Sequence, residues 1–139
     1  MRPTFSSIYT DFAKALSHRS TCTRMRVGCV IASENSKYVY GIGYNGGAAG
    51  MKDCCTGEEG KCGCLHAEIN AIINCNNHNP EHPKVIYTTL SPCVMCAKAI
   101  INLDGVIRVV YLEEYRNKEG IELLEKAGIK CLSLCTPAA

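Results

Sequence analysis

The stretch "CLHAEIN" (residues 64–70) carries a histidine and a glutamate one residue apart, where an apolar run beginning at Ile69 opens a helix. We expect that helix over residues 66–75. A carboxylate in its first turn can stabilise the helix dipole, or it can take part in chemistry. Ideal helical geometry turns the first and third positions of such a helix about 200° apart. His66 and Glu68 can therefore face one point only in an irregular first turn, which is where the sequence places them.

The rest of the chain alternates between helical and extended patterns, with Gly, Pro and Asn at the boundaries. We expect helices at residues 5–20, 66–75, 91–105 and 117–128, and strands at residues 26–33, 38–45, 84–90, 106–112 and 129–134. An opening hairpin followed by alternation predicts an α/β domain with a five-stranded mixed sheet and helices on both faces. The last helix is long enough for a crossover, so the fourth and fifth strands are expected to run parallel.

The first of these helices has a regular apolar pattern, with Thr4 or Ser6 as its cap. The spacing predicts one apolar helix face made of Phe5, Ile8, Phe12, Ala15 and Leu16.

The length and composition bound the class of protein. A chain of 139 residues is expected to form a single domain, residues 1–139. A net charge of +2 argues against a broad nucleic-acid-binding surface. No run approaches membrane-spanning length, and the N-terminus lacks the continuous apolar core of a signal peptide. Eleven cysteines without such a signal favour reduced thiols in the cytoplasm, the host cytoplasm if the chain is viral, with some of the thiols as metal ligands.

The motif "PCVMC" (residues 92–96) lies at the expected start of another helix. Cys93 and Cys96 are three positions apart, so both sulfurs can converge on one point, and His66 can supply a third ligand. Two thiolates and one imidazole suit zinc, and three protein ligands leave a fourth position open for water. Zinc lowers the pKa of such a water to about 7. The partial positive charge of the helix start also favours the thiolates.

Each motif has a simpler explanation when it is taken alone. A C-x-x-C pair can be a structural zinc or redox motif, and an H-x-E pair can merely place a carboxylate at a helix start. In this order and at these two junctions, however, they match the zinc deaminase signature H-x-E followed by P-C-x-x-C. A purely structural zinc module that binds a protein or nucleic acid would need a fourth protein ligand and would have no use for Glu68.

Four longer stretches extend the match: "RMRVGCVI", "GIGYNGGAAG", "LHAEINAI" and "SPCVMCAKAII". Through them the chain resembles the cytidine deaminase-like superfamily, and specifically its deoxycytidylate (dCMP) deaminases, over about residues 23–129. The resemblance implies a three-layer α/β/α fold, with His66, Cys93 and Cys96 as zinc ligands and Glu68 as the proton carrier. The implied reaction hydrolyses dCMP to dUMP and ammonia, which supplies a thymidylate precursor. A deaminase of free cytidine or deoxycytidine, or of a tRNA adenosine, shares these motifs and remains an alternative.

The resemblance also suggests residues that bind the nucleotide substrate. Asn45 has an amide that can both donate and accept, and its family counterpart resembles a contact to the deoxyribose and base; the alternative is a turn residue. Ala67 and Ser91, next to the expected metal ligands, are further candidates.

A 5'-phosphate needs a cation or a helix start. Arg26, beside the first strand, and Arg116, before the last helix, are the candidates, although each could be a solvated surface arginine. Tyr115 could pack over the base or fill the sheet edge.

The resemblance also implies a homohexamer. In this family dCTP commonly activates the enzyme and dTTP inhibits it, with Mg²⁺ on the triphosphate effector. The stretch "GYNGGAAG" is similar to the segment that carries this regulation, so Gly43, Gly46 and Gly47 are candidate allosteric residues. Ala48 or Ala49 stands where the family has a proline, which makes the loop less stiff.

The remaining cysteines are more than one zinc ion requires. Some viral dCMP deaminases are similar in carrying a second, structural zinc, for which we expect Cys22, Cys54, His78 and His82, or the neighbouring loop cysteines Cys55, Cys62 and Cys64. Prolines near the two histidines rule out a regular helix, so the spacing does not show that these residues converge. Cys29 and Cys131 lie in apolar strands and are expected in the core.

Overall fold

The computed structural model describes residues 1–51, 55–58 and 62–134. In these residues every expected helix and strand forms, and most of them are shorter than the sequence patterns suggest, although the strand at 84–90 has the expected bounds and the one starting at 106 extends to 113. The helices are α1 (Phe5–Ser17), α2 (Ala67–Ile73), α3 (Val94–Leu103) and α4 (Glu119–Lys126). The strands are β1 (Gly28–Ser33), β2 (Val39–Tyr44), β3 (Lys84–Leu90), β4 (Val106–Glu113) and β5 (Lys130–Ser133).

The five strands form one mixed sheet in the order β2-β1-β3-β4-β5. Strand β1 is antiparallel to both of its neighbours, whereas β3 and β4, and β4 and β5, are parallel. This confirms the mixed sheet and the parallel final pair. The carboxyl ends of β3 and β4 meet where Leu90 pairs with Glu113. Ligand sites of α/β sheets characteristically form beyond such an edge.

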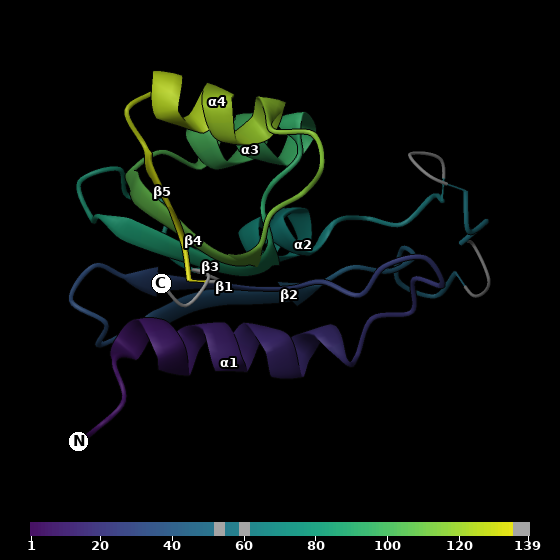
Figure 1. Ribbon diagram of the computed structural model, residues 1–139, viewed down its shortest axis with the longest axis horizontal. Coiled ribbons are helices and arrows are strands. Elements are labelled where there is room, and N and C mark those ends of the chain that lie inside the picture. The colour runs from purple at the N-terminus through teal and green to yellow at the C-terminus, as the bar shows by residue number, and fades with distance from the viewer. Residues whose placement is uncertain (52–54, 59–61, 135–139) are drawn as a thin grey trace.

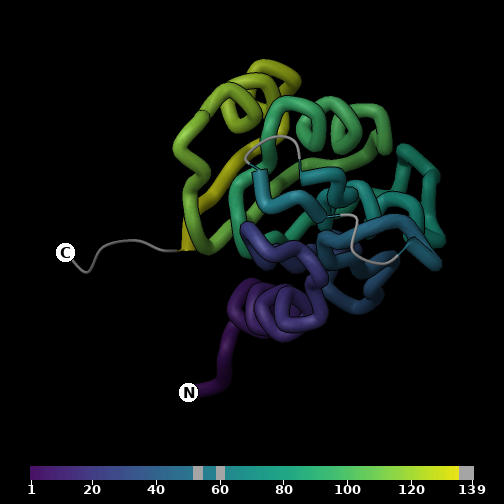
Figure 2. Tube along the Cα trace, turned by 90° about the vertical axis from the view of Figure 1, so that its right-hand side faces the viewer, coloured from purple at the N-terminus to yellow at the C-terminus, as the bar shows by residue number. Residues whose placement is uncertain are grey.

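Helices cover both faces of the sheet and give the three layers expected (Figure 1). Figure 2 shows α1 on one side of the sheet, with α3 and α4 on the other. Successive residues along a strand point to opposite faces, so each strand contributes to two cores. Val30 and Val85 pack in the core beneath α1, and Cys29 and Ile86 pack in the core beneath the other three helices. Cys131 is only half-buried at the margin of that second core.

Most of the predicted apolar face of α1 points away from the sheet, and of its members only the half-buried Leu16 packs against the core. Phe5, Ile8 and Phe12 are exposed, and the buried residues are mostly small ones, among them Ala13. The reason is the close approach of helix and strand, because a Cβ at Gly28 would lie 1.8 Å from the carbonyl oxygen of Ala13. Only small side chains fit between backbones this close, so Phe5, Ile8 and Phe12 are displaced towards solvent, and Tyr9 and Leu16 pack at the margin of the contact.

Helix α1 starts at Phe5 as expected and ends at Ser17, before the predicted end at residue 20. Thr4 is the cap, since its hydroxyl oxygen accepts a 3.1 Å hydrogen bond from the backbone N–H of Ser7. Over the residues that the structure describes, no helix combines the length and the apolar character needed to cross a bilayer.

Helix α2 lies equally close to the edge strand β2. A Cβ at Gly43 would lie 2.4 Å from the backbone nitrogen of Ala71, so any side chain there would push α2 away from the sheet. Gly43 lies within β2 itself and has this packing role. The contact fixes the position of α2, and with it the helix start that carries His66 and Glu68.

Candidate active site

The expected metal ligands come from the starts of two helices. His66 precedes α2 and Cys93 precedes α3, and both have extended backbone dihedral angles. Neither side chain caps its own helix. Both are therefore free to point towards a shared position in front of the helix starts, and Cys96 joins them from the first turn of α3.

These three side chains meet with a spacing that suits zinc. The Nδ1 atom of His66 lies 3.2 Å from the Sγ atom of Cys96 and 3.4 Å from that of Cys93. A tetrahedral zinc ion with ordinary bond lengths would hold such nitrogen and sulfur atoms about 3.6 Å apart. The donor set of two sulfurs and one nitrogen, brought this close, fits a zinc ion with one coordination position left for a non-protein ligand.

The ligand cluster is electrostatically prepared for a cation. The hydrogen bond from the Cys96 thiol, together with the contact with His66, lowers the pKa of Cys93 to about 4, although burial acts in the opposite direction. The same bond to Cys93 raises the pKa of Cys96, and the Cys93 contact raises that of His66. One thiolate is thus already present at neutral pH, and it attracts a positive ion.

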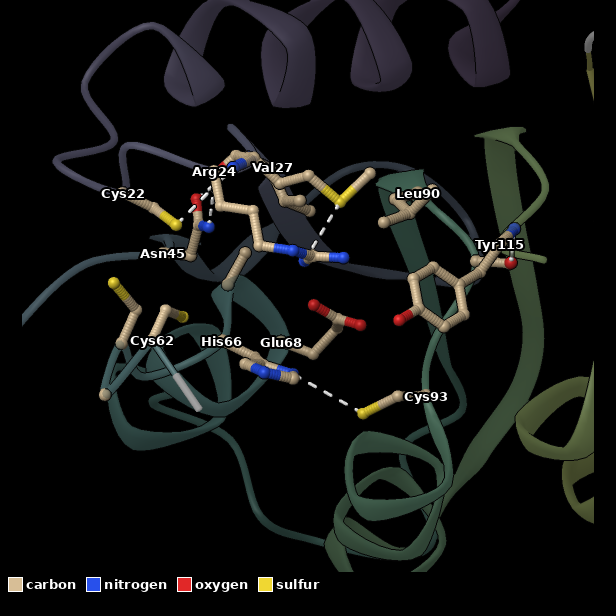
Figure 3. A pocket seen from close by; sticks show the side chains of 15 residues that line it. Cys22, Arg24, Val27, Asn45, Cys62, His66, Glu68, Leu90, Cys93 and Tyr115 are labelled. Atoms are coloured by element: carbon tan, nitrogen blue, oxygen red, sulfur yellow. Dashed lines mark hydrogen bonds between the residues drawn. The ribbon is translucent and has the colours of Figure 1, made fainter. Parts of the chain in front are cut away.

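Glu68 lies in the first turn of α2, and its carboxyl group points into the pocket between Arg24 and His66 (Figure 3). The side chain is only 4% exposed. Burial raises the pKa of this carboxyl to about 7. A carboxyl group with such a pKa can both take up and release a proton near neutral pH, which is the property of a proton carrier.

The pocket in front of these groups has a cavity volume of about 140 Å³. Several residues singled out from the sequence line it: Asn45, His66, Ala67, Glu68, Ser91, Cys93 and Tyr115. They lie directly after β2 and β3, at the starts of α2 and α3, and in the segment after β4. The fold therefore brings together residues that are up to 70 positions apart in the sequence.

Asn45 is buried, and both ends of its side-chain amide bond the backbone in front of β1. Its Oδ1 accepts from the N–H of Val27 at 2.9 Å, and its Nδ2 donates to the carbonyl oxygen of Met25 at 2.7 Å. Asn45 thus positions the segment that carries Arg24. Its role therefore goes beyond that of a turn residue. A second N–H and a second lone pair of the amide lie outside these two bonds.

Ser91 is buried behind Tyr115. Its Oγ accepts a 2.6 Å hydrogen bond from the backbone N–H of Tyr115, and its own backbone N–H donates to the carbonyl oxygen of Glu113 at 2.9 Å. These bonds hold the segment after β4 against the start of α3. In Figure 3 the ring of Tyr115 consequently points into the pocket.

The arginines differ from the sequence expectation. Arg26 is exposed and lines neither of the two hollows described in the structure. Arg24 lines both of them, and Arg116 lines only the second, which adjoins the first. The chain bends at Thr23 and Arg24, which turns Arg24 over the pocket and leaves Arg26 in solvent. Arg24 was not among the residues predicted from the sequence, because only the bend distinguishes it from Arg26.

Gly46 links the glycine-rich stretch to the active site. Its N–H donates to the carbonyl oxygen of Leu65 at 3.1 Å, and the N–H of Leu65 donates back at 2.7 Å. Gly46 is therefore bonded to the residue directly before His66, while Gly47 is half-buried beyond it.

The predicted second cluster forms with different members. His78 contacts the carbonyl oxygen of Cys75 at 2.9 Å, and His82 contacts the side-chain amide of Asn77 at 2.9 Å, so the structure places neither histidine at the loop cysteines. Cys54 lies outside the described residues. The cysteines that do meet are Cys22, Cys55, Cys62 and Cys64.

Comparison with known proteins agrees with this fold. The family model of the "cytidine and deoxycytidylate deaminase zinc-binding region" matches residues 4–113. The chain is 33% identical to the deoxycytidylate deaminase of Saccharomyces cerevisiae over 93% of its own length and 44% of the yeast protein. It is 31% identical to the deoxycytidylate deaminase of Mycobacterium phage D29, over 81% of this chain and 98% of the phage protein.

A solved structure is similar over almost the whole length of both chains. The dCMP deaminase from the cyanophage S-TIM5, in complex with dCMP and dUMP, superimposes with a TM-score of 0.83. It is 31% identical to this chain and covers 96% of this chain and 99% of the cyanophage chain. The chain spans less than half the length of the yeast relative.

An α/β/α sandwich with a Cys, Cys, His metal site and a buried glutamate at two helix starts defines the class of zinc-dependent deaminases. Within that class, the chain belongs to the cytidine and deoxycytidylate deaminase family.

Proposed function

We propose that residues 1–139 form one catalytic domain that hydrolyses dCMP to dUMP and ammonia. The observation that carries this proposal is the buried Glu68, with a pKa of about 7, beside the converging His66, Cys93 and Cys96. Relatives named deoxycytidylate deaminases and the dCMP-bound cyanophage structure support dCMP as the substrate.

The reaction replaces the amino group on C4 of cytosine with an oxygen atom from water. His66, Cys93 and Cys96 would hold zinc, which supplies an activated water when bound. Glu68 takes a proton from the attacking water and delivers it to N3 of the ring, while the water oxygen bonds to C4. It then takes the remaining proton of the new C4 hydroxyl and delivers it to the amino group, so that the C4–N bond breaks, ammonia leaves and a C4 carbonyl forms. The burial of Glu68 keeps bulk water from exchanging with these protons.

The substrate is oriented by the wall of the pocket. Tyr115 lies where a base would enter, and Asn45 has hydrogen-bonding capacity left for the sugar and base. The adjoining hollow contains Arg24 and Arg116, two cations that suit a 5'-phosphate. A nucleoside without a phosphate would leave that hollow unused. Specificity for the nucleotide over the free nucleoside follows from these two arginines.

Purified protein should be assayed with dCMP, deoxycytidine, cytidine and a tRNA substrate, measuring formation of the uracil or inosine product. We expect turnover of dCMP, and at least tenfold lower kcat/KM for the nucleosides. Arg24→Gln should raise the KM for dCMP, whereas the matched variant Arg26→Gln should leave it unchanged. Preferential turnover of deoxycytidine or of tRNA adenosine would contradict the proposed substrate.

The regulation and assembly of the family are proposed for this chain as well. The domain would act in the cytoplasm as a homo-oligomer, a hexamer by resemblance, regulated by dCTP and dTTP with Mg²⁺. The exposed Phe5, Ile8 and Phe12 of α1 offer apolar surface for subunit contact, and the Gly46–Leu65 bonds connect the glycine-rich stretch to His66. Gel filtration with and without dCTP and Mg²⁺ tests this: a monomer under both conditions would contradict it.

A further inference from the structure

We propose that Asn70 is a positioning residue for the reaction. Its side chain fixes the first turn of α2, which carries Glu68, against the end of β2, where Asn45 follows. The inference rests on the proposed function, in which Glu68 carries the protons. Asn70 lines neither of the two hollows described in the structure, so it acts on the reaction only through the groups that it holds.

Asn70 is bonded to both elements at once. Its side-chain Nδ2 donates to the carbonyl oxygen of Tyr44, the last residue of β2, at 2.9 Å. Its backbone N–H donates to the carbonyl oxygen of His66 at 3.1 Å. Asn70 is half-buried, so water competes with the Tyr44 bond less than it would at an exposed site. One residue therefore joins the helix start at His66 to the strand end that precedes Asn45.

The Tyr44 bond is one of a series along the free edge of the sheet. Strand β2 is an edge strand, and alternate carbonyl groups of such a strand point away from its only neighbour. Three of these carbonyl groups accept hydrogen bonds from α2 or from the residues just after it. The bonds, each 2.9 Å long, run from Asn70 Nδ2 to Tyr44, from Asn74 Nδ2 to Ile42 and from the Asn76 N–H to Tyr40. The series holds α2 along the edge, and Asn70 provides the bond nearest to Glu68.

Packing alone does not fix where α2 lies along the strand. A Cβ at Gly41 would lie 2.5 Å from the carbonyl oxygen of Ala71, and one at Gly43 would lie 2.4 Å from the backbone nitrogen of the same residue. At these two positions β2 presents bare backbone, which sets how closely the helix approaches but offers no side chain for it to interlock with. A hydrogen bond depends on direction as well as distance, so the Asn70 bond sets the position of α2 along β2.

The sequence of α2 agrees with this role. The helix has only 7 residues, and isolated helices shorter than about 12–15 residues are marginal in water. Asparagine is also one of the weaker helix formers, yet Asn70 occupies the centre of α2. Its contribution therefore comes from the bond to Tyr44 and not from helix propensity.

Loss of this bond should impair the chemical step more than substrate binding. Glu68 precedes Asn70 by two residues, so a shift of α2 moves its carboxyl group relative to the base. Asn45 keeps its own bonds to Val27 and Met25, and the wall that binds the substrate therefore stays in place. A displacement of about 1 Å can lower a rate about 100-fold.

Kinetics of two Asn70 variants test the proposal. Asn70→Leu removes the donor, keeps a similar shape, adds no charge and improves helix propensity. Asn70→Ala removes the donor in a second way, so a folding failure of one variant leaves the other. We expect either variant to lower kcat for dCMP at least about tenfold, with KM within about twofold of the wild type. Zinc content should be unchanged, because the paired bonds between Gly46 and Leu65 still hold the residue before His66.

Asn74→Leu is the matched control. Asn74 makes the equivalent bond to Ile42, one helical turn further from Glu68, and is exposed. The kcat of Asn74→Leu should stay within about twofold of the wild type. Wild-type kcat for the Asn70 variants would overturn the proposal, and so would an equal loss of kcat in Asn74→Leu.

A double-mutant cycle separates positioning from general damage. A residue that acts through Glu68 has little left to act on once that carboxyl group is gone. In a Glu68→Gln background, Asn70→Leu should lower the residual kcat by less than about twofold. The same large loss in both backgrounds would show damage unrelated to Glu68 and would refute the positioning role.

Hydrogen–deuterium exchange tests the placement of α2 without any substrate. In the zinc-loaded full chain, the backbone amides of residues 66–71 should exchange at least about threefold faster in Asn70→Leu than in the wild type or in Asn74→Leu. Equal exchange in all three proteins would rule out the inference. Absence of dCMP turnover in a wild type that shows the expected exchange pattern would instead contradict the proposed function, so the two failures are distinguishable.

Discussion

Replacing Asn45 with aspartate tests whether its amide positions the wall of the active site. The carboxylate has the same shape, and it can still accept the hydrogen bond from Val27 N–H, which is 2.9 Å long. It has no N–H to donate to the carbonyl oxygen of Met25. Two acceptors would therefore face each other across the present 2.7 Å, in a place where Asn45 is only 6% exposed.

The cost follows from the lost bond and from the carbonyl left without a partner. A buried hydrogen bond contributes about 1 kcal/mol, and an unsatisfied buried acceptor costs about 1–3 kcal/mol more. Asn45→Asp should therefore lower the free energy of unfolding by about 2–4 kcal/mol. The entropy of unfolding at the melting point is about 2.1 cal/mol/K per residue, or about 0.3 kcal/mol/K for 139 residues. The melting temperature should thus fall by about 7–14 °C.

Thermal melting of zinc-loaded protein at pH 8, followed by circular dichroism, measures this effect. Asn74→Asp is the matched control, because Asn74 donates an equivalent 2.9 Å bond to the carbonyl oxygen of Ile42 but is exposed, so water can replace it. We expect the control to lose less than about 1 kcal/mol. Equal melting temperatures for the two variants would refute the positioning role of Asn45.

The Asn45→Asp deficit should also depend on pH. The protonated carboxyl can donate to Met25, so folding raises the pKa of the introduced group above its unfolded value of about 3.9. The deficit is then complete above the raised folded pKa and shrinks as the pH falls through it towards 3.9. Thermal melting of the wild type and of Asn45→Asp at pH 8 and pH 5 should show a smaller difference in melting temperature at the lower pH. A gap that is unchanged or larger in acid would contradict this explanation.

Two further substitutions test the frame that holds the site. Lys84 is fully buried, and its Nζ donates to three backbone carbonyl oxygens at 2.8–3.4 Å. In urea titration, Lys84→Met should lower the free energy of unfolding by about 3 kcal/mol. The same substitution at the exposed Lys98 is the control and should lower it by less than about 0.5 kcal/mol. A Cβ at Gly120 would lie 2.1 Å from the carbonyl oxygen of Pro92, directly before the proposed metal ligand Cys93. Gly120→Ala should cost about 2 kcal/mol in thermal melting and reduce bound zinc, and wild-type values of both would contradict the packing described.

Sequence patterns predicted most of the architecture, because local signals and the global fold agree. The helix starts at His66 and Cys93 could be found from motif spacing alone, and the order of elements predicted the parallel pairing of β4 and β5. The shared edge of the sheet then brings the two helix starts together. Motifs at the starts of helices are informative about the active site, because the fold places those helix starts at predictable positions along the edge of the sheet.

The predictions that were wrong concern features set by a close approach of two backbones or by irregular segments of the chain. The apolar pattern of α1 wrongly placed Phe5, Ile8 and Phe12 against the sheet, because Gly28 admits the helix too closely for large side chains. The bend at Thr23 selected Arg24 over Arg26. The H-x₃-H spacing of His78 and His82 suggested a metal site, but neither side chain reaches the cysteines of the loop. None of these features has a periodic signature.

The most direct test of the proposed chemistry is Glu68→Gln, measured for zinc content and for dCMP turnover in the same preparation. The amide keeps the shape of Glu68 but cannot carry a proton, and general acid–base catalysis is typically worth about 10²–10⁴ in rate. Glu119→Gln, an exposed glutamate in the first turn of α4, is the matched control. We predict unchanged zinc content with kcat lowered at least about 100-fold for Glu68→Gln, and wild-type kcat for Glu119→Gln. Wild-type turnover by zinc-loaded Glu68→Gln would contradict the account.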